Sequence, residues 1–448
     1  MNKSRRLLIA AMFLDTLGGG LLAPFELIYA LRIAHLSLTS AGLALSVAAA
    51  AGIALGPLAG AAVDRVGPAP VVAVANLLGA AGCLSLLFWT CGWGYGLGAF
   101  LLSANMRTFW AAFTPLVASI AAAAELERWF GRLRAARYVG IVAGEALSGI
   151  FFIGGVAAGL RMLVVANGLS FLAALALVLA ALPAHHPVTN RDGQEEEPRS
   201  GYRRALADRV NVAAAALNVP ATLLLIAPVL VLPVFILERL HLPAWLPGVL
   251  AALLTATATV GLLFGTRLVY GRRRLRNLEI AAVLWAIACA VFLLAPLTVA
   301  LVYCALVVGV LLLGLGEAFY APTADALPAA LAPLALRGRY AALHQMAWGI
   351  SEAIAPTLAA VTLAVSNTAL WLTLACIATA TAFLYRALEK PTGGRDGIAG
   401  AELHLHPGVD RSQSRVGCRL EARGGVKALD GDDSPSGHRL GGAVRLRP

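Results

Sequence analysis

The chain has 448 residues, of which 59% are hydrophobic and only 13% are charged. A water-soluble protein of this size cannot bury so large an apolar fraction, so the composition indicates a membrane protein with several spans. Basic loops beside membrane segments account for the net charge of +11, which therefore does not indicate nucleic-acid binding. The six cysteines lack Cys-x-x-Cys spacing, which predicts small core residues rather than disulfides or a metal site. No cofactor is expected.

Apolar runs separated by charged residues, proline or glycine predict twelve membrane-spanning helices. In chain order the runs are 7–31, 38–62, 70–90, 97–122, 138–160, 162–182, 211–237, 246–270, 278–295, 297–321, 340–363 and 368–388. Alternation of these spans leaves only Arg32, Arg161 and Arg239 on the side opposite the N-terminus. The positive-inside rule then predicts that both termini are cytoplasmic.

The predicted fold is an all-α polytopic membrane protein with two six-helix halves, at 1–182 and 211–390. Residues 183–210 are polar and charged, which predicts a cytoplasmic linker between the halves. Residues 391–448 are rich in glycine and have no periodic apolar run. We expect this tail to be disordered.

A shift of 207 residues aligns the two halves without a gap across their fourth and fifth spans. The matching pairs are Pro115 with Pro322, Gly131 with Gly338, Arg132 with Arg339, Ala135 with Ala342, Glu145 with Glu352, and Ala146 with Ala353. Because each half has an even number of spans, both halves enter the membrane from the same side. This predicts a parallel repeat about an axis along the membrane normal, with a site between the halves near the midplane.

The stretch Gly60-Ala-Ala-Val-Asp64-Arg65-Val-Gly67 places two glycines and an ion pair between the second and third spans, where a tight turn is expected. It resembles the signature that the major facilitator superfamily carries in this loop. Arg107 in the fourth span resembles the intramembrane arginine of that family. Arg337-Gly338-Arg339, entering the eleventh span, resembles a loop of its bacterial drug:proton antiporter-like members.

The resemblance covers about residues 5–390. It implies that the Gly60–Gly67 stretch and the loop at 337–339 form a cytoplasmic gate. Asp64 would cap the start of the eleventh span, where a helix N-terminus favours negative charge, and hold the halves together on the inside. The resemblance also implies that spans one, four, seven and ten line a central cavity.

Charged side chains at the centre of a membrane helix cost about 2.5–3.5 kcal/mol, so each indicates a partner, a wet cavity or a function. Asp15 and Glu26 are eleven residues apart, about three turns, and are expected to share one face of the first span. With Arg107, Asp15 is a candidate proton or cation site in the central cavity. An alternative is a fixed Asp15–Arg107 pair that only ties two helices together.

Three further residues are candidates for the cavity. Trp110 extends the face of Arg107, while Glu317 and Tyr320 share a face of the tenth span. Glu145 and Glu352 are instead expected to be structural, each paired with backbone or with a loop arginine such as Arg132 or Arg339.

Taken together, the sequence predicts a secondary transporter, and not an enzyme, in the cytoplasmic membrane of a bacterium. It is expected to act as a monomer and to export a small hydrophobic or cationic compound in exchange for protons. Proton-coupled uptake of a small metabolite is one alternative, and a membrane receptor that does not transport is another.

Overall fold

The computed structural model describes residues 3–120, 125–181, 206–269, 273–297, 299–333 and 336–392. Every regular element in these ranges is a helix. Most of the predicted linker (183–210) and of the predicted tail (391–448) lies outside the described residues.

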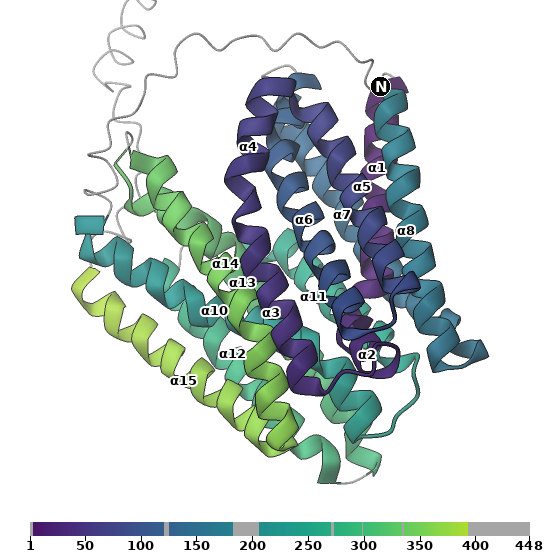
Figure 1. The fold of residues 1–448 in the computed structure, drawn as a ribbon. Helices are drawn as coiled ribbons and strands as arrows, with labels where there is room; N and C mark the ends of the chain where they lie inside the picture. Colours follow the sequence, from purple (N-terminus) through teal and green to yellow (C-terminus); the bar gives the residue numbers. More distant parts are fainter. Residues whose placement is uncertain are drawn as a thin grey trace, which may run out of the picture. The chain divides into compact units, whose positions relative to one another are not determined.

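The first half contributes six membrane spans, some of them broken into shorter helices. They are α1 (Lys3–Leu22) with η1 (Ala23–Phe25) and α2 (Glu26–Arg32), α3 (Leu38–Ile53) with α4 (Leu55–Val66), α5 (Pro68–Phe88), α6 (Gly92–Ile120), α7 (Leu126–Ser148) with η3 (Gly149–Gly154), and α8 (Val156–Ala181). Figure 1 shows these helices in purple, blue and teal.

The second half contributes the other six. They are α10 (Arg209–Val234) with the π-helical turn η4 (Phe235–Arg239), α11 (Leu246–Val269), α12 (Arg274–Leu294) with η5 (Ala295–Leu297), α13 (Val299–Leu331), α14 (Arg337–Val365) and α15 (Asn367–Thr392). Within the described part of the chain, eleven spans meet simple criteria of length and apolarity. The remaining one is α6, a 29-residue helix that carries Arg107 at mid-length.

The prediction of twelve spans is therefore confirmed, but three of them differ from the expected form. The first span is interrupted by a 3₁₀ turn at Ala23–Phe25, with Pro24 inside it. Proline cannot donate the backbone hydrogen bond that a continuous helix needs there. Asp15 in α1 and Glu26 in α2 consequently do not lie on one uninterrupted helix, contrary to the expectation of a shared face.

The second span breaks at Ala54, and its continuation α4 includes most of the Gly60–Gly67 stretch. Gly60, Asp64 and Arg65 are thus helical, and the turn is confined to Gly67, whose φ is +85° and ψ is 166°. This backbone region is accessible almost only to glycine. Pro68 then begins α5, where its missing N–H costs nothing.

The fifth span starts well before the predicted 138–160, because α7 already begins at Leu126. Its first turns carry several arginines, which hid the helix from a reading based on apolarity alone. Arg137, expected in a cytoplasmic loop, is therefore in the middle of a helix.

Close packing within the first half depends on small residues facing α1. A Cβ atom added to Gly140 would lie 2.7 Å from the carbonyl oxygen of Phe13, and one added to Gly144 would lie 2.2 Å from that of Leu17. Such contacts let helix backbones approach closely in membranes, where packing replaces the hydrophobic effect between helices. The core of the second half includes an aromatic contact, with the ring centroids of Phe292 and Trp371 4.5 Å apart.

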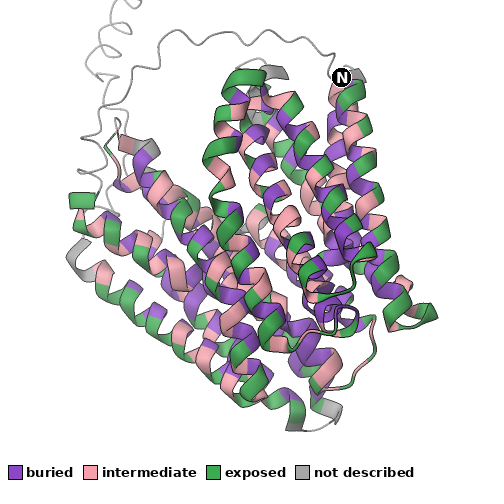
Figure 2. Ribbon diagram, in the orientation of Figure 1, coloured by how far each residue is buried: buried purple, intermediate pink, exposed green. Residues whose placement is uncertain are grey.

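The two halves meet mainly where α3 packs on α14 and where α7 packs on α11. Figure 1 shows α3 lying against α14. Figure 2 shows buried residues along the helix faces that meet and exposed residues along many of the remaining faces. The starts of α6 and α13, at Gly92 and Val299, are separated by the 207 residues of the predicted repeat.

Candidate functional site between the halves

A cavity of about 230 Å³ lies between the two halves. The first half lines it with residues of α1, α2, α3, α5 and α6, and the second half with residues of α10 and α14. The lining residues are Leu22, Glu26, Tyr29, Leu45, Ala48, Ala49, Leu86, Tyr95, Ala99, Leu102, Ser103, Met106, Ile226, Leu230, Glu352 and Pro356. The wall is therefore mostly apolar, with two carboxylates.

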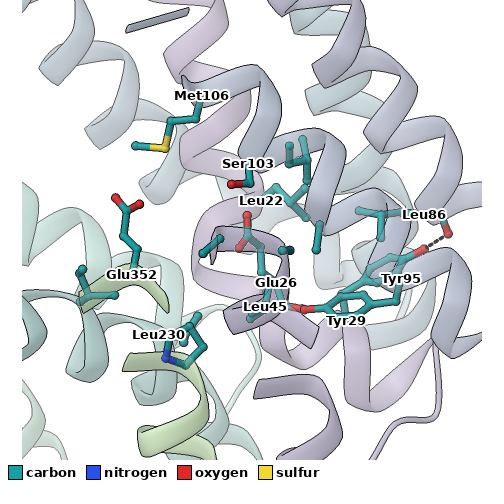
Figure 3. A pocket seen from close by; sticks show the side chains of 16 residues that line it. Leu22, Glu26, Tyr29, Leu45, Leu86, Tyr95, Ser103, Met106, Leu230 and Glu352 are labelled. Atoms are coloured by element: carbon teal, nitrogen blue, oxygen red, sulfur yellow. Dashed lines mark hydrogen bonds between the residues drawn. The ribbon is translucent and has the colours of Figure 1, made fainter. Parts of the chain in front are cut away.

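Glu26 and Glu352 supply these carboxylates from opposite halves, and Figure 3 shows them on facing sides of the cavity. Glu26 is the first residue of α2, placed there by the 3₁₀ turn that precedes it. The two lining tyrosines are already engaged: the Tyr29 hydroxyl donates to the Leu86 carbonyl at 2.6 Å, and the Tyr95 hydroxyl donates to the Glu26 carbonyl at 3.3 Å. A ligand therefore meets mainly their rings.

Glu352 forms an ion pair with Arg107, in which the guanidinium Nη2 donates to the carboxylate Oε2. Arg107 belongs to α6 and Glu352 to α14, so the pair joins the halves beside the cavity. Both side chains remain about a quarter exposed, at 24% and 23%. The expected partner of Glu352, backbone or a loop arginine such as Arg132 or Arg339, was wrong, because its carboxylate pairs with Arg107 of the fourth span. Glu352 also lines the cavity and so belongs to the candidate site.

A second group of charges surrounds Arg137 of α7. Its guanidinium lies 5.0 Å from the ring centroid of Trp110, which is a cation–π contact. Arg137 also interacts electrostatically with Asp15 of α1 and with Glu317 of α13. Neither carboxylate forms an ion pair with Arg137, but this one arginine interacts with an acid of each half.

The structure thus separates residues that the sequence placed in one space. Glu26 and Arg107 belong to the cavity and its ion pair, whereas Asp15, Trp110 and Glu317 gather around Arg137. The charged partner of Arg107 is Glu352 and not Asp15. Arg137 was missed because it was assigned to a loop; its spacing from Gly140 and Gly144 on one helix face was the signal that could have found it.

Tyr320 lies apart from both groups. Only 2% of it is exposed, its hydroxyl donates to Oδ1 of Asn218 at 2.6 Å, and its ring packs 5.5 Å from that of Trp285. All three residues belong to the second half. Tyr320 therefore stabilises the interior of that half and does not line the cavity, contrary to expectation.

Glu145 of α7 lies at the packing surface between α7 and α11. It is 7% exposed, and its Oε2 atom has no hydrogen-bond partner. Thr255 of α11 hydrogen-bonds to its side chain, and Glu317 contributes a repulsive charge. Glu145 is therefore held by neither backbone nor a loop arginine, which corrects that expectation.

The residues of the expected gate lie at one end of the halves. Asp64 and Arg65 are exposed in the last turn of α4, and a Cβ atom added to Gly60 would meet nothing within 4 Å. Arg337 and Gly338 begin α14, and Arg339 is buried with 8% exposure. The N-cap of α14 is Leu336, without a side-chain cap, so Asp64 does not cap this helix here.

At the other end the halves are in tight contact. A Cβ atom added to Gly42 of α3 would lie 2.4 Å from that of Ala360 in α14. Nearby, the hydroxyl of Thr357 donates to Ser46 at 2.7 Å. Arg32 of α2 forms a two-point ion pair with Glu238 of η4, at 2.7 and 3.0 Å. We refer to these contacts as the seam.

A helical membrane protein with two six-helix halves, a cavity between them and paired charges across it has the architecture of an alternating-access transporter. The sequence model of the Major Facilitator Superfamily matches residues 8–305. The chain belongs to this superfamily and is a membrane transporter. No curated protein matches the chain.

Solved structures support the same fold. The nucleoside transporter NupG matches with a TM-score of 0.75 and 15% identity over 87% of this chain and 100% of that one. A mutant of a peptide transporter POT, in complex with sulfate, matches with a TM-score of 0.71 and 14% identity over 89% of this chain and 96% of that one. A bacterial homologue of the iron transporter ferroportin, in an inward-facing state, matches with a TM-score of 0.69 and 16% identity over 88% and 99%. At identities this low, the matches show a common fold and carry no information about the substrate.

Proposed function

We propose that this transporter exports a small hydrophobic or cationic compound by alternating access, in exchange for protons. The observation that carries the proposal is the Arg107–Glu352 ion pair beside the cavity between the halves. The guanidinium of Arg107 occupies the position beside Glu352 that the positive group of a substrate would take. A bound cation then competes with Arg107 for the carboxylate and loosens a contact that ties the halves together.

The cavity wall fits this class of compound. Its lining is mostly aliphatic and aromatic, which suits an apolar body, while Glu26 and Glu352 offer negative charge from two sides. Small-molecule sites commonly combine apolar walls with a few polar groups that fix orientation. Since the hydroxyls of Tyr29 and Tyr95 are engaged with backbone carbonyls, their rings can face a cation directly.

We assign proton coupling to the group around Arg137. Asp15 and Glu317 come from different halves and share this one arginine. A movement of the halves changes the distance of each carboxylate from the guanidinium, and with it the preference of each carboxylate for a proton. Protons and substrate would then use separate acids.

We further propose that the described conformation is the inward-facing state. The seam holds the halves together at the end that carries Arg32 and Glu238. Asp64 of α4 stands exposed and does not cap α14. With both termini on the cytoplasmic side, as the distribution of arginines predicts, the closed end faces outward.

The test uses the purified chain in liposomes with an imposed pH gradient. Lipophilic cations should be transported in preference to neutral and anionic compounds of the same size. Reversing the pH gradient should reverse the direction of the flux. Glu352→Gln should lose cation transport by at least about tenfold, as expected when one charged contact is removed. Glu125→Gln, which alters a surface carboxylate paired with Arg5, is the matched control.

Transport of the cations at an unchanged rate by Glu352→Gln would contradict the site. A flux that ignores the pH gradient would contradict proton exchange. Coupled movement of substrate and protons in the same direction would favour the uptake alternative.

A further inference from the structure

A second cavity lies on the outer side of the second half, between α12 and α15, away from the cavity between the halves. Its volume of about 420 Å³ falls in the range of small-ligand sites. Glu279 and Arg386 mark one end of its lining, and the remaining positions are apolar apart from Thr379. The hydroxyl of Thr379 donates to the Ala375 carbonyl at 2.8 Å, so its hydrogen-bond donor is already satisfied without a ligand.

The lining residues show that this cavity is a groove along the helices. On α12 they follow helical spacing from Glu279 to Ala290, and on α15 from Thr379 to Arg386. Eleven residues of helix span about 16 Å. The hydrocarbon core of a bilayer is about 30 Å thick. The groove is therefore about as long as the hydrocarbon part of one leaflet, which is half of this thickness.

The charged end of the groove carries more arginines than carboxylates. Glu279, whose side chain is 9% exposed, pairs with Arg276 at 2.6 Å and with Arg386 at 3.6 Å. Next to them, Arg273 pairs with Glu389 at 3.5 Å. Three arginines therefore face two carboxylates, which leaves one positive charge in excess.

This geometry also orients the two arginines. Glu279 pairs with Arg386, which lines the groove, and with the neighbouring Arg276, while 63% and 50% of the two arginine side chains remain exposed. A guanidinium can bind a phosphate through two parallel N–H groups. Arg276 and Arg386 are near the start of α12 and the end of α15, where a membrane helix leaves the hydrocarbon.

We propose that this groove binds one anionic phospholipid. The phosphate of the headgroup contacts Arg276 and Arg386, and one acyl chain lies along the apolar stripe formed by Val283, Ile287, Ala290 and Phe383. The excess positive charge favours an anionic headgroup. A zwitterionic headgroup has no net charge, because its ammonium group cancels the charge of its phosphate. The apolar stripe requires a chain of about one leaflet in length, and an inorganic anion would leave it unfilled.

The experiment measures lipid binding to the purified full chain in detergent by native mass spectrometry. The probes are dioleoyl phosphatidylglycerol and dioleoyl phosphatidylcholine, each added at the same concentrations. The parent protein should retain one phosphatidylglycerol with at least about tenfold preference. Equal retention of the two lipids would overturn the proposal.

Two variants separate the headgroup from the chain. Arg276→Gln with Arg386→Gln should reduce retention of phosphatidylglycerol by about tenfold or more, since two charged contacts are lost. Ala290→Phe fills the far end of the groove and should reduce retention with both arginines intact. Arg161→Gln, at an exposed arginine of α8 outside the groove, should bind as the parent does.

Unchanged binding in the double arginine variant would overturn the headgroup assignment. Unchanged binding in Ala290→Phe would show adsorption at the surface and overturn the groove. Melting temperatures measured without added lipid identify any variant that fails to fold. If the double arginine variant fails to fold, Arg386→Gln alone tests the headgroup contact. If Ala290→Phe fails to fold, Ala290→Leu tests the acyl-chain groove.

Discussion

Arg107 and Glu352 are each the sixteenth residue of a 29-residue helix, and their ion pair joins α6 of one half to α14 of the other. Both residues therefore lie halfway along their helices, where a lone charge is costly. The ion pair offsets the free-energy cost of placing each charge inside the membrane. Any movement that separates the halves at this level must replace one of the two partners.

The exchange of charges across this pair is the first prediction. Arg107→Glu alone places two carboxylates together and should reduce transport and stability, because like charges repel each other and an unpaired charge at this depth of the membrane is costly. The double variant Arg107→Glu with Glu352→Arg restores the pair and should recover the melting temperature. It should not recover cation transport, since an arginine then replaces Glu352 at the cavity. Recovery of both would show that the pair is only structural.

The second prediction concerns Gly60 and Gly67. Gly67→Ala should destabilise the protein by about 1–3 kcal/mol, because a Cβ atom is strained at a φ of +85° and ψ of 166°. Gly60→Ala should not destabilise the protein, since nothing lies within 4 Å of the added atom and alanine favours the helix more than glycine does. If α4 packs against the second half in the other conformation, Gly60→Ala will nevertheless slow transport. Chemical unfolding in detergent and transport rates in liposomes measure the two effects separately.

Gly42 provides a third prediction. Gly42→Leu should push α3 away from α14, since even a Cβ atom at this position approaches Ala360 to 2.4 Å. The seam should open, and the mean distance between spin labels at Thr39 and His241 should increase by several ångströms relative to the parent. Gly56→Leu is the control, because Gly56 has no neighbour within 4 Å. An unchanged distance distribution in Gly42→Leu would contradict the role given to the seam.

The acids around Arg137 give a fourth prediction. Asp15→Asn and Glu317→Gln should each abolish transport driven by a pH gradient, because neither amide can carry a proton through the cycle. Exchange of labelled for unlabelled substrate across the membrane should continue, since the cavity between the halves is intact. Proton movement measured with a pH-sensitive dye should fall together with the driven flux. Loss of substrate exchange in both variants would instead place these acids in the substrate site.

Much of the fold could be predicted from the sequence, because the membrane imposes one dominant rule. Apolar runs of about 20 residues must be helices that satisfy their own backbone, so the number of spans could be counted. Span ends were less predictable where charge and helix overlap. The N-terminal part of α7, up to its middle, contains Arg132, Arg134 and Arg137, and a count of apolar residues excluded them.

The candidate site was predictable only in part, for a physical reason. Intramembrane charge marked Glu26 and Arg107 as exceptional, and the cavity and the ion pair include them. Which charges meet is decided by tertiary packing between helices that are distant in sequence. No spacing in the chain relates Arg107 to Glu352, and none distinguishes the cavity residue Glu26 from the buried Tyr320.

The ion pair between Arg32 and Glu238 has a consequence for the conditions in which the transporter operates. Its side chains are 52% and 28% exposed, at the rim of the seam. Exposed pairs contribute about 0–1 kcal/mol, and dissolved salt screens them over roughly 8 Å at physiological ionic strength. With the seam on the outer face, as proposed above, the rate at which this end opens should therefore rise with the salt concentration of the medium outside the cell.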